Sequence, residues 1–222
     1  MSEFYIGYSP IPAGLRTFVR RVVAVLGVIA AGAAIALVLE QDPFAPSVFE
    51  FHEYREFEGV LITKPYPALV AADGLPWLLA GPGKHGFAPP SELRGQVVRL
   101  RGERIYRGPD RMIAVQGVTA VRPSEPPPEV DLGPVELTGE IVDSKCYFGV
   151  MNPGNGKVHR DCAVRCLSGG IPPALIVRDA AGAGRTVLLA NWRRELLDRV
   201  AEPVTIRGRL ARSAGRLILY AE

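Results

Sequence analysis

The chain has 222 residues, of which 48% are hydrophobic and 22% are charged, so it carries enough apolar side chains to bury a sizeable core. Its formal charge is +3 at pH 7, and its arginines are spread along the chain instead of forming one basic stripe. This pattern argues against a nucleic-acid-binding protein, and we expect no nucleic acid among its partners.

An uncharged apolar segment near the N-terminus is the first predicted element. The eighteen residues 22–39, VVAVLGVIAAGAAIALVL, contain no charged side chain. As a helix, such a segment is just long enough to cross a hydrocarbon core of roughly 30 Å. We therefore predict a transmembrane helix within residues 16–41 and a lipid bilayer as the partner of this helix.

The charges that flank this segment predict its orientation. Arg20 and Arg21 precede it, whereas Glu40 and Asp42 follow it, and the positive-inside rule places the arginine side in the cytoplasm. Residues 1–15 would then form a short cytoplasmic tail. The rest of the chain would lie in the periplasm, anchored to a bacterial inner membrane.

A cleaved signal peptide is the alternative interpretation, because signal peptides also combine basic, apolar and small-residue regions. The apolar stretch of eighteen residues is longer than the usual signal core of about 7 to 15 residues. No clean A-x-A cleavage site precedes Asp42. We therefore favour a retained anchor, and the sequence leaves the cleaved form open.

Beyond the apolar segment, the sequence changes to short β-type runs separated by turn residues. Alternating or β-branched runs such as EFEGVLIT and PWLLAG predict half-buried strands. A proline-dense polar segment at residues 123–134 is typical of a semi-rigid linker. We therefore predict two modules, at residues 48–122 and 135–222.

The two modules share a pattern near their C-terminal ends. Residues 96–115 (QVVRLRGERIYRGPDRMIAV) correspond to residues 203–222 (PVTIRGRLARSAGRLILYAE), each with a Leu/Ile-Arg-Gly step, a glycine-containing turn and a last apolar strand. The segments before them, SELRG and RRELLDRV, would be short helices. Because this order of elements resembles the OB-fold, the predicted fold class is mainly β: one N-terminal transmembrane helix followed by two tandem small OB-like β-barrel modules.

All three cysteines of the chain lie in one short segment of the second module, together with one of its three histidines. Flanking glycines predict a helix over residues 157–168. That helix would place His159, Cys162 and Cys166 at i, i+3 and i+7, on one face. Cys146, at the end of the opening strand, can supply a fourth ligand to the same place.

Several chemistries suit these four residues. A tetrahedral Cys3His set is a standard structural zinc site, so we expect one metal ion, with zinc as the first candidate and copper or an iron–sulfur cluster as further candidates. Outside the cytoplasm cysteines also oxidise, which leaves open a disulfide from Cys146 to Cys162 or Cys166. The odd number of cysteines argues against that alternative, because one thiol would remain unpaired.

The cysteine segment also resembles a motif seen in small exported bacterial proteins: C-Y/F, then G-x-x-H-x-x-C-A-x-x-C, then G-x-P. The matching residues are Cys146, Tyr147, Gly156, His159, Cys162, Ala163, Cys166, Gly170 and Pro172. The resemblance covers only part of the second module. It implies an exported domain and carries over no activity.

These patterns together predict a membrane-anchored periplasmic accessory subunit or assembly factor of a respiratory or oxidoreductase membrane complex. A thiol-dependent redox carrier or enzyme that uses Cys162 is one alternative, and a disulfide-stapled interaction module without metal is another. No catalytic residue is assigned, because no third group is evident that would orient His159 as a base for Cys162. The remaining histidines, His52 and His85, are expected to be solvated loop residues.

Overall fold

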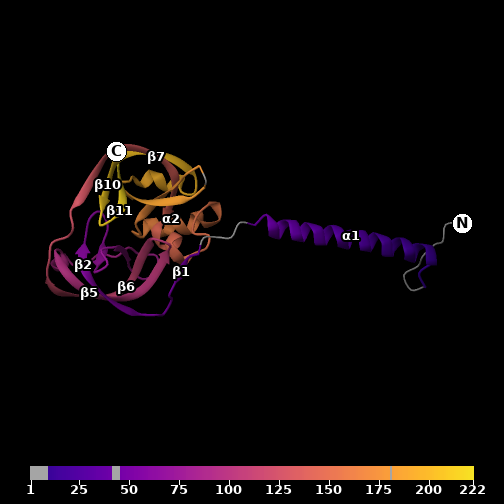
Figure 1. Ribbon diagram of the computed structural model, residues 1–222, viewed down its shortest axis with the longest axis horizontal. Coiled ribbons are helices and arrows are strands. Elements are labelled where there is room, and N and C mark those ends of the chain that lie inside the picture. Colours follow the sequence, from indigo (N-terminus) through magenta and orange to yellow (C-terminus); the bar gives the residue numbers. More distant parts are fainter. Residues whose placement is uncertain (1–9, 42–45, 181) are drawn as a thin grey trace. The chain divides into compact units, whose positions relative to one another are not determined.

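The computed structural model describes residues 10–41, 46–180 and 182–222. The chain divides into two compact units, one that ends at Pro43 and one from Phe44 to Glu222. The first unit contains a single long helix, α1 (Ala13–Leu39), and the second contains the β-barrels (Figure 1).

Helix α1 corresponds to the predicted transmembrane segment. It has 27 residues and a mean hydropathy of 2.9 in its most apolar part, and none of its residues is buried by other parts of the chain that the structure describes. At 1.5 Å per residue, such a helix is roughly 40 Å long. It is therefore long and apolar enough to cross a bilayer. Of the predicted cytoplasmic tail, residues 1–9 lie outside the described residues.

The first barrel closes in the order β5-β2-β3-β4-β6, because β6 pairs back onto β5. The β4–β6 pair is parallel and the other pairs are antiparallel. A short strand, β1 (Val48–Phe49), adds to β5 outside the closed ring. The barrel strands are β2 (Arg55–Ile62), β3 (Ala68–Ala71), β4 (Pro76–Ala80), β5 (Gln96–Arg107) and β6 (Asp110–Pro123).

The second barrel repeats this topology, with the order β7-β8-β9-β11-β10 and one parallel pair, β9 and β11. In each barrel a short 3-10 helix, η1 (Ser91–Leu93) or η4 (Arg194–Arg199), lies between the third and fourth strands. The prediction of two tandem OB-like barrels is therefore confirmed. The strands are β7 (Glu129–Asp143), β8 (Pro173–Arg178), β9 (Gly184–Ala190), β10 (Pro203–Ser213) and β11 (Arg216–Ala221).

The repeated Arg-Gly step has a steric cause. A β-carbon on Gly102 would lie 2.5 Å from the carbonyl oxygen of Ala114, and one on Gly208 would lie 2.1 Å from that of Tyr220. Both glycines thus sit where the backbone of the neighbouring strand approaches too closely for any side chain. A glycine is therefore required at the same position of both barrels, which explains why the Arg-Gly step occurs in both sequences.

The connection between the barrels is shorter than the proline-rich sequence suggests. Strand β6 extends to Pro123 and β7 begins at Glu129. Residues 129–134, which we expected to belong to the linker, pair with β10. Only residues 124–128 therefore connect the two barrels.

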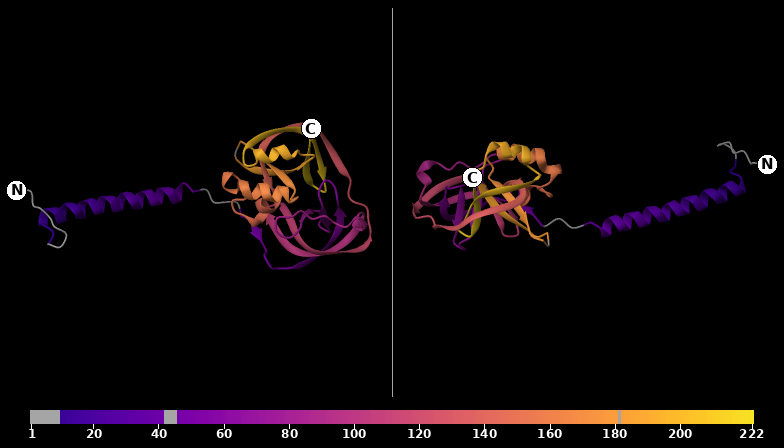
Figure 2. Two further views of the ribbon diagram at one scale, coloured as in Figure 1. Left: turned by 180° about the vertical axis from the view of Figure 1, so that it is seen from behind. Right: turned by 90° about the horizontal axis from the view of Figure 1, so that it is seen from above.

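The two barrels pack against each other through a shared apolar cluster. Met112 of the first barrel belongs to the same buried cluster as Phe148 and Ile171 of the second. The backbones also meet directly, since the amide of Gly86 donates to the carbonyl oxygen of Gly169 over 2.9 Å. Figures 1 and 2 show the cysteine segment, with helix α2 (Arg160–Ser168), at this junction.

Candidate metal centre

The connection from β7 to β8 carries all three cysteines. It begins with a π-helical turn, η2 (Cys146–Val150), and continues through a 3-10 turn, η3 (Lys157–His159), into α2. The predicted helix over residues 157–168 is therefore present, with its first turn in 3-10 form. π-Helical turns are rare and occur frequently at functional sites.

The three thiol sulfurs form a tight triangle. The Sγ atom of Cys146 lies 4.0 Å from that of Cys162 and 3.9 Å from that of Cys166, and all three sulfurs lie within 4.8 Å of one another. All three cysteines are free thiols. Three sulfurs this close together would be able to bind one metal ion jointly as thiolates.

The triangle is buried on one side and open on the other. Cys146 and Cys166 are 4% and 1% exposed, whereas Cys162 is partly exposed. The hydrogen bond from Cys146 to Cys166 lowers the pKa of the Cys166 thiol and raises that of the Cys146 thiol. Within this pair, Cys166 is therefore the thiol that ionises first, and a thiolate is the form that binds metal.

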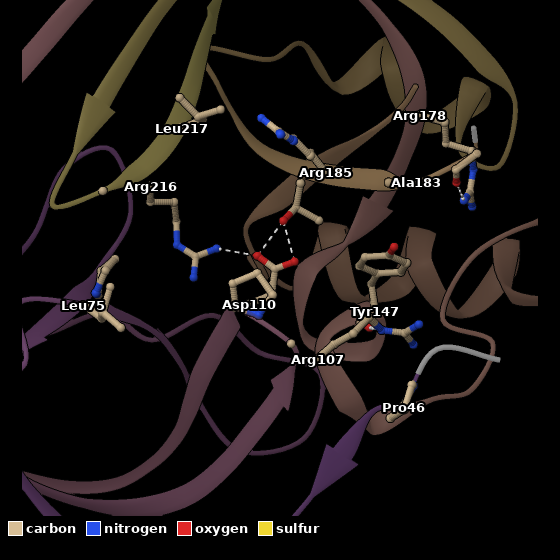
Figure 3. A pocket seen from close by; sticks show the side chains of 17 residues that line it. Pro46, Leu75, Arg107, Asp110, Tyr147, Arg178, Ala183, Arg185, Arg216 and Leu217 are labelled. Carbon is tan, nitrogen blue, oxygen red and sulfur yellow. Dashed lines mark hydrogen bonds and ion pairs between the residues drawn. The ribbon is translucent and has the colours of Figure 1, made fainter. Parts of the chain in front are cut away.

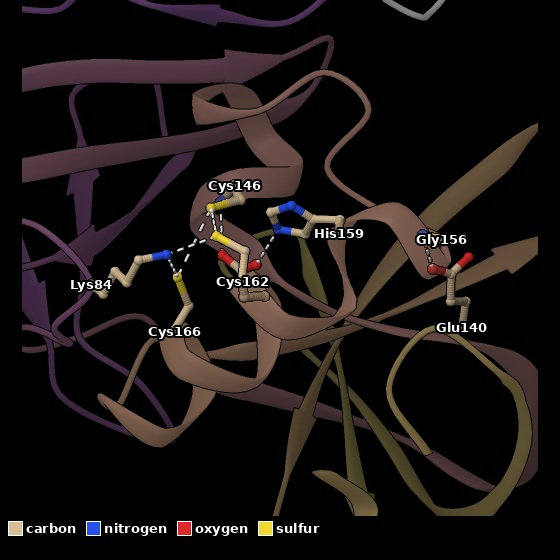
Figure 4. A network of polar contacts seen from close by, with 8 residues as sticks. Lys84, Glu140, Cys146, Gly156, His159, Cys162 and Cys166 are labelled. Atoms are coloured by element: carbon tan, nitrogen blue, oxygen red, sulfur yellow. Dashed lines mark hydrogen bonds and ion pairs between the residues drawn. The ribbon is translucent and has the colours of Figure 1, made fainter. Parts of the chain in front are cut away.

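Lys84 of the first barrel covers the open side of the triangle (Figure 4). Its Nζ atom lies 2.7 Å from the Sγ of Cys162 and 3.9 Å from the Sγ of Cys166. The contact with Cys162 raises the pKa of Lys84, which keeps its ammonium group charged. The same charge also contributes to the lowered pKa of the Cys166 thiol.

Lys145 holds the loop that carries Lys84. Its buried Nζ atom donates to the carbonyl oxygens of Gly81, over 2.7 Å, and of Gly83, over 2.8 Å. Burial lowers the pKa of this ammonium group, and the two carbonyl acceptors compensate part of its lost hydration. Lys145, which directly precedes Cys146, therefore connects the first barrel to the thiol triangle.

His159 lies beside the triangle and is hydrogen bonded to Asp143. Its Nε2 atom is 2.9 Å from Oδ2 of Asp143, and both side chains are buried. The other carboxylate oxygen accepts the amide of Cys146 over 2.8 Å. Asp143, Cys146 and His159 thus form a second group of candidate ligand atoms, which shares Cys146 with the thiol triangle.

The structure therefore brings the four predicted ligands to one place, as two overlapping groups. The three cysteines form one group, and His159 belongs to the other. Binding of a metal by all four residues stays a prediction. Asp143 occupies the Nε2 atom of His159, so Nδ1 would have to be the ligand atom, and a carboxylate on the other ring nitrogen is the usual arrangement of metal-binding histidines.

Three charged residues of this site were not predicted from the sequence. Asp143 and Lys145 stand directly before Cys146 in the run VDSKC, and charges at the end of an apolar strand are a signal that could have found them. Lys84 stands in the loop GPGKHG, where only the exposed His85 was considered. No local pattern connects this loop with the cysteines.

Comparisons of the chain with protein-family models, with curated proteins and with solved structures gave no match. The resemblance to small exported bacterial proteins therefore rests on the cysteine motif alone.

Proposed function

We propose that this protein is a membrane-anchored metal–thiolate protein in which Cys146, Cys162 and Cys166 bind one metal ion. The observation that carries the proposal is the triangle of free thiols, with sulfur–sulfur distances of 3.9 Å and 4.0 Å from Cys146 to the other two. Three converging thiolates suit zinc or Cu(I).

The geometry favours a metal over a disulfide. A disulfide joins two sulfurs at about 2.05 Å and would leave the third thiol without a role. Here Cys146 is nearly equidistant from Cys162 and Cys166. One ion can bind all three sulfurs at once, whereas a disulfide would join Cys146 to only one of the other two cysteines.

Zinc is the first candidate, with His159 as the fourth ligand. Structural zinc sites are almost always four-coordinate, and Cys3His is one of their standard sets. Cu(I) is the second candidate, because thiolate ligands select it among the soft metals. The metal would supply a structural or electron-transfer centre, and the chain's own residues would supply the thiolates and the nearby Lys84 charge.

We further propose that the protein is an accessory subunit or assembly factor of a respiratory or oxidoreductase complex, on the periplasmic side of a bacterial inner membrane. Helix α1 supports the anchor, because it is apolar and long enough to cross a bilayer. Arginines at its N-terminal end support the orientation. Small barrels of this architecture commonly bind partners, which fits a tethered subunit.

Metal loading of the reduced full-length chain in detergent tests the metal site. After incubation with Zn²⁺ or Cu(I) and removal of the excess, we expect one ion per chain in the wild type and near zero in Cys162→Ser. The control Met151→Ser changes an exposed residue of the same connection and should keep the full stoichiometry. Equal metal content in all three proteins, or none in the wild type, would contradict the proposal.

Native electrophoresis of membranes extracted in mild detergent tests the accessory role. The full chain is expected to migrate in a complex much larger than its own 24.0 kDa. Protease added to cells with a permeabilised outer membrane should degrade the barrels. Migration as a free monomer, or barrels protected from the protease, would contradict this part of the proposal.

A further inference from the structure

A cleft of about 780 Å³ opens between the two barrels (Figure 3). Its walls include the β5–β6 turn of the first barrel and the β8–β9 and β10–β11 turns of the second. Its volume lies within the range of roughly 300–1,000 Å³ that is usual for small-molecule sites. The cleft is therefore large enough for an organic ligand.

The charged side chains that line this cleft are mostly cationic. Four arginines, Arg107, Arg178, Arg185 and Arg216, face one carboxylate, Asp110. That carboxylate already has partners, because Nη1 of Arg216 lies 3.1 Å from its Oδ1 and the hydroxyl of Thr186 donates to it over 2.5 Å. Among the described residues, no carboxylate pairs with Arg107 or Arg185. The cleft thus keeps a positive charge that its own residues do not neutralise.

Two of these guanidinium groups are held rigidly in the wall. Arg107 lies over the ring of Tyr147, 4.5 Å from the centroid, and its Nε donates to the carbonyl oxygen of that residue over 2.6 Å. Arg216 lies over the ring of Phe148, and its side chain is only 10% exposed. Such fixed guanidinium groups lose little freedom when they bind a ligand.

The same two groups have buried donors without an acceptor. Within the described part of the chain, Nη2 of Arg107 and Nε of Arg216 are buried and make no hydrogen bond. A buried donor is costly when it is left unpaired. Both atoms are too buried to touch a ligand in the cleft, so an anion would be contacted there by the exposed guanidinium groups of Arg178 and Arg185.

We propose that this cleft binds a small organic anion that carries a phosphate or carboxylate group. Guanidinium groups pair with both through two parallel hydrogen bonds, which explains the use of arginine. The apolar residues Leu75 and Leu217 in the lining would contact the organic part of the ligand. This inference is independent of the proposed metal site, because no cysteine lines the cleft.

Calorimetric titration of the full chain in detergent at low ionic strength tests this proposal. The probes are citrate, glucose 1-phosphate and inorganic phosphate. We expect saturable binding, with one site per chain, of at least one organic probe, more tightly than inorganic phosphate. Absence of saturable binding by both organic probes, or equal binding of inorganic phosphate, would overturn the proposal.

Variants then locate the binding site. Arg185→Gln changes an exposed residue of the lining and should weaken binding at least about tenfold without affecting folding. Arg107→Gln should also weaken binding at least about tenfold. Its thermal melting curve is recorded to confirm that the variant folds. The control Arg212→Gln removes an exposed arginine outside the cleft and should bind like the wild type. Unchanged binding in both cleft variants would refute the site.

The variant Cys162→Ser separates this test from that of the metal site. It removes a thiol of the proposed metal centre and leaves the cleft intact, so it should bind the organic probes as the wild type does. Loss of anion binding in this variant would contradict the independence of the two sites.

Discussion

The ammonium nitrogen of Lys84 lies 2.7 Å from the sulfur of Cys162, although the two residues belong to different barrels. The contact depends on the packing of the barrels, because Gly86 bonds to Gly169 at the same junction. The thiol site of the second barrel is therefore completed by a charge from the first.

Replacing Lys84 by methionine should slow the reaction of Cys162 with iodoacetamide in the metal-free protein. The substitution keeps most of the side-chain length and removes the ammonium group that lies 2.7 Å from the Cys162 sulfur, so the reacting sulfur loses its nearest positive charge. Mass spectrometry of the labelled peptide at pH 7 gives the rate, and we expect a decrease of about three- to tenfold. The control Lys157→Met removes an exposed lysine of the same connection. An unchanged rate in Lys84→Met would show that the contact does not activate the thiol.

Gly169→Ala should separate the barrels locally. Its new β-carbon would lie 2.1 Å from the carbonyl oxygen of Lys84, and backbone at both sides leaves no flexible group to move away. We expect the free energy of unfolding in urea to fall by about 2 kcal/mol or more. Gly117→Ala, where no atom lies within 4 Å of the new carbon, is the matched control. Equal stability of the two variants would contradict the described junction.

His159→Gln should weaken metal binding without abolishing it. The substitution removes the proposed fourth ligand and the ring that holds Asp143, whereas the three thiols remain. We expect an affinity loss of roughly 10–100-fold, as for other changes around metal ligands. The free energy of unfolding of the metal-free protein should fall by about 2–3 kcal/mol, because a buried carboxylate loses its partner. Complete loss of metal would show that the thiols are not the principal ligands.

Glu50→Gln should destabilise the first barrel in a pH-dependent way. Hydrogen bonds from Arg104 and Arg55 lower the pKa of Glu50 below its ordinary value of 4.5. A carboxyl group with a lowered pKa in the folded state stabilises the protein at neutral pH, and this contribution is lost as the pH falls through the folded-state pKa.

At pH 7 we therefore expect Glu50→Gln to lower the free energy of unfolding by about 1–2 kcal/mol. The difference from the wild type should shrink as the pH falls below 4.5. Urea unfolding at pH 7 and at about pH 3 measures it, with the exposed Glu56→Gln as control. A difference that stays constant over this range would exclude the ion pair as its cause.

Much of the fold could be predicted because its signals are local. Alternating strands and the repeated Arg-Gly step, at Gly102 and Gly208, indicated both barrels. The spacing of His159, Cys162 and Cys166 placed them on one helical face, which α2 and the preceding turn confirm.

The residues of the site that were not predicted depend on contacts between distant segments. Lys84 reaches Cys162 because backbone glycines, Gly86 and Gly169, allow the barrels to touch, and such contacts leave no pattern in one sequence. His159 was expected on the same helical face as Cys162 and Cys166. Its ring also bonds Asp143, because β7 ends with that carboxylate buried directly beside it.

X-ray absorption at the metal edge of the zinc-loaded, reduced chain tests the central claim most directly. We predict three sulfur ligands at about 2.3 Å and one nitrogen ligand at about 2.0 Å, and almost no metal signal from Cys162→Ser taken through the same loading. A spectrum with only nitrogen and oxygen neighbours would contradict a centre built by Cys146, Cys162 and Cys166.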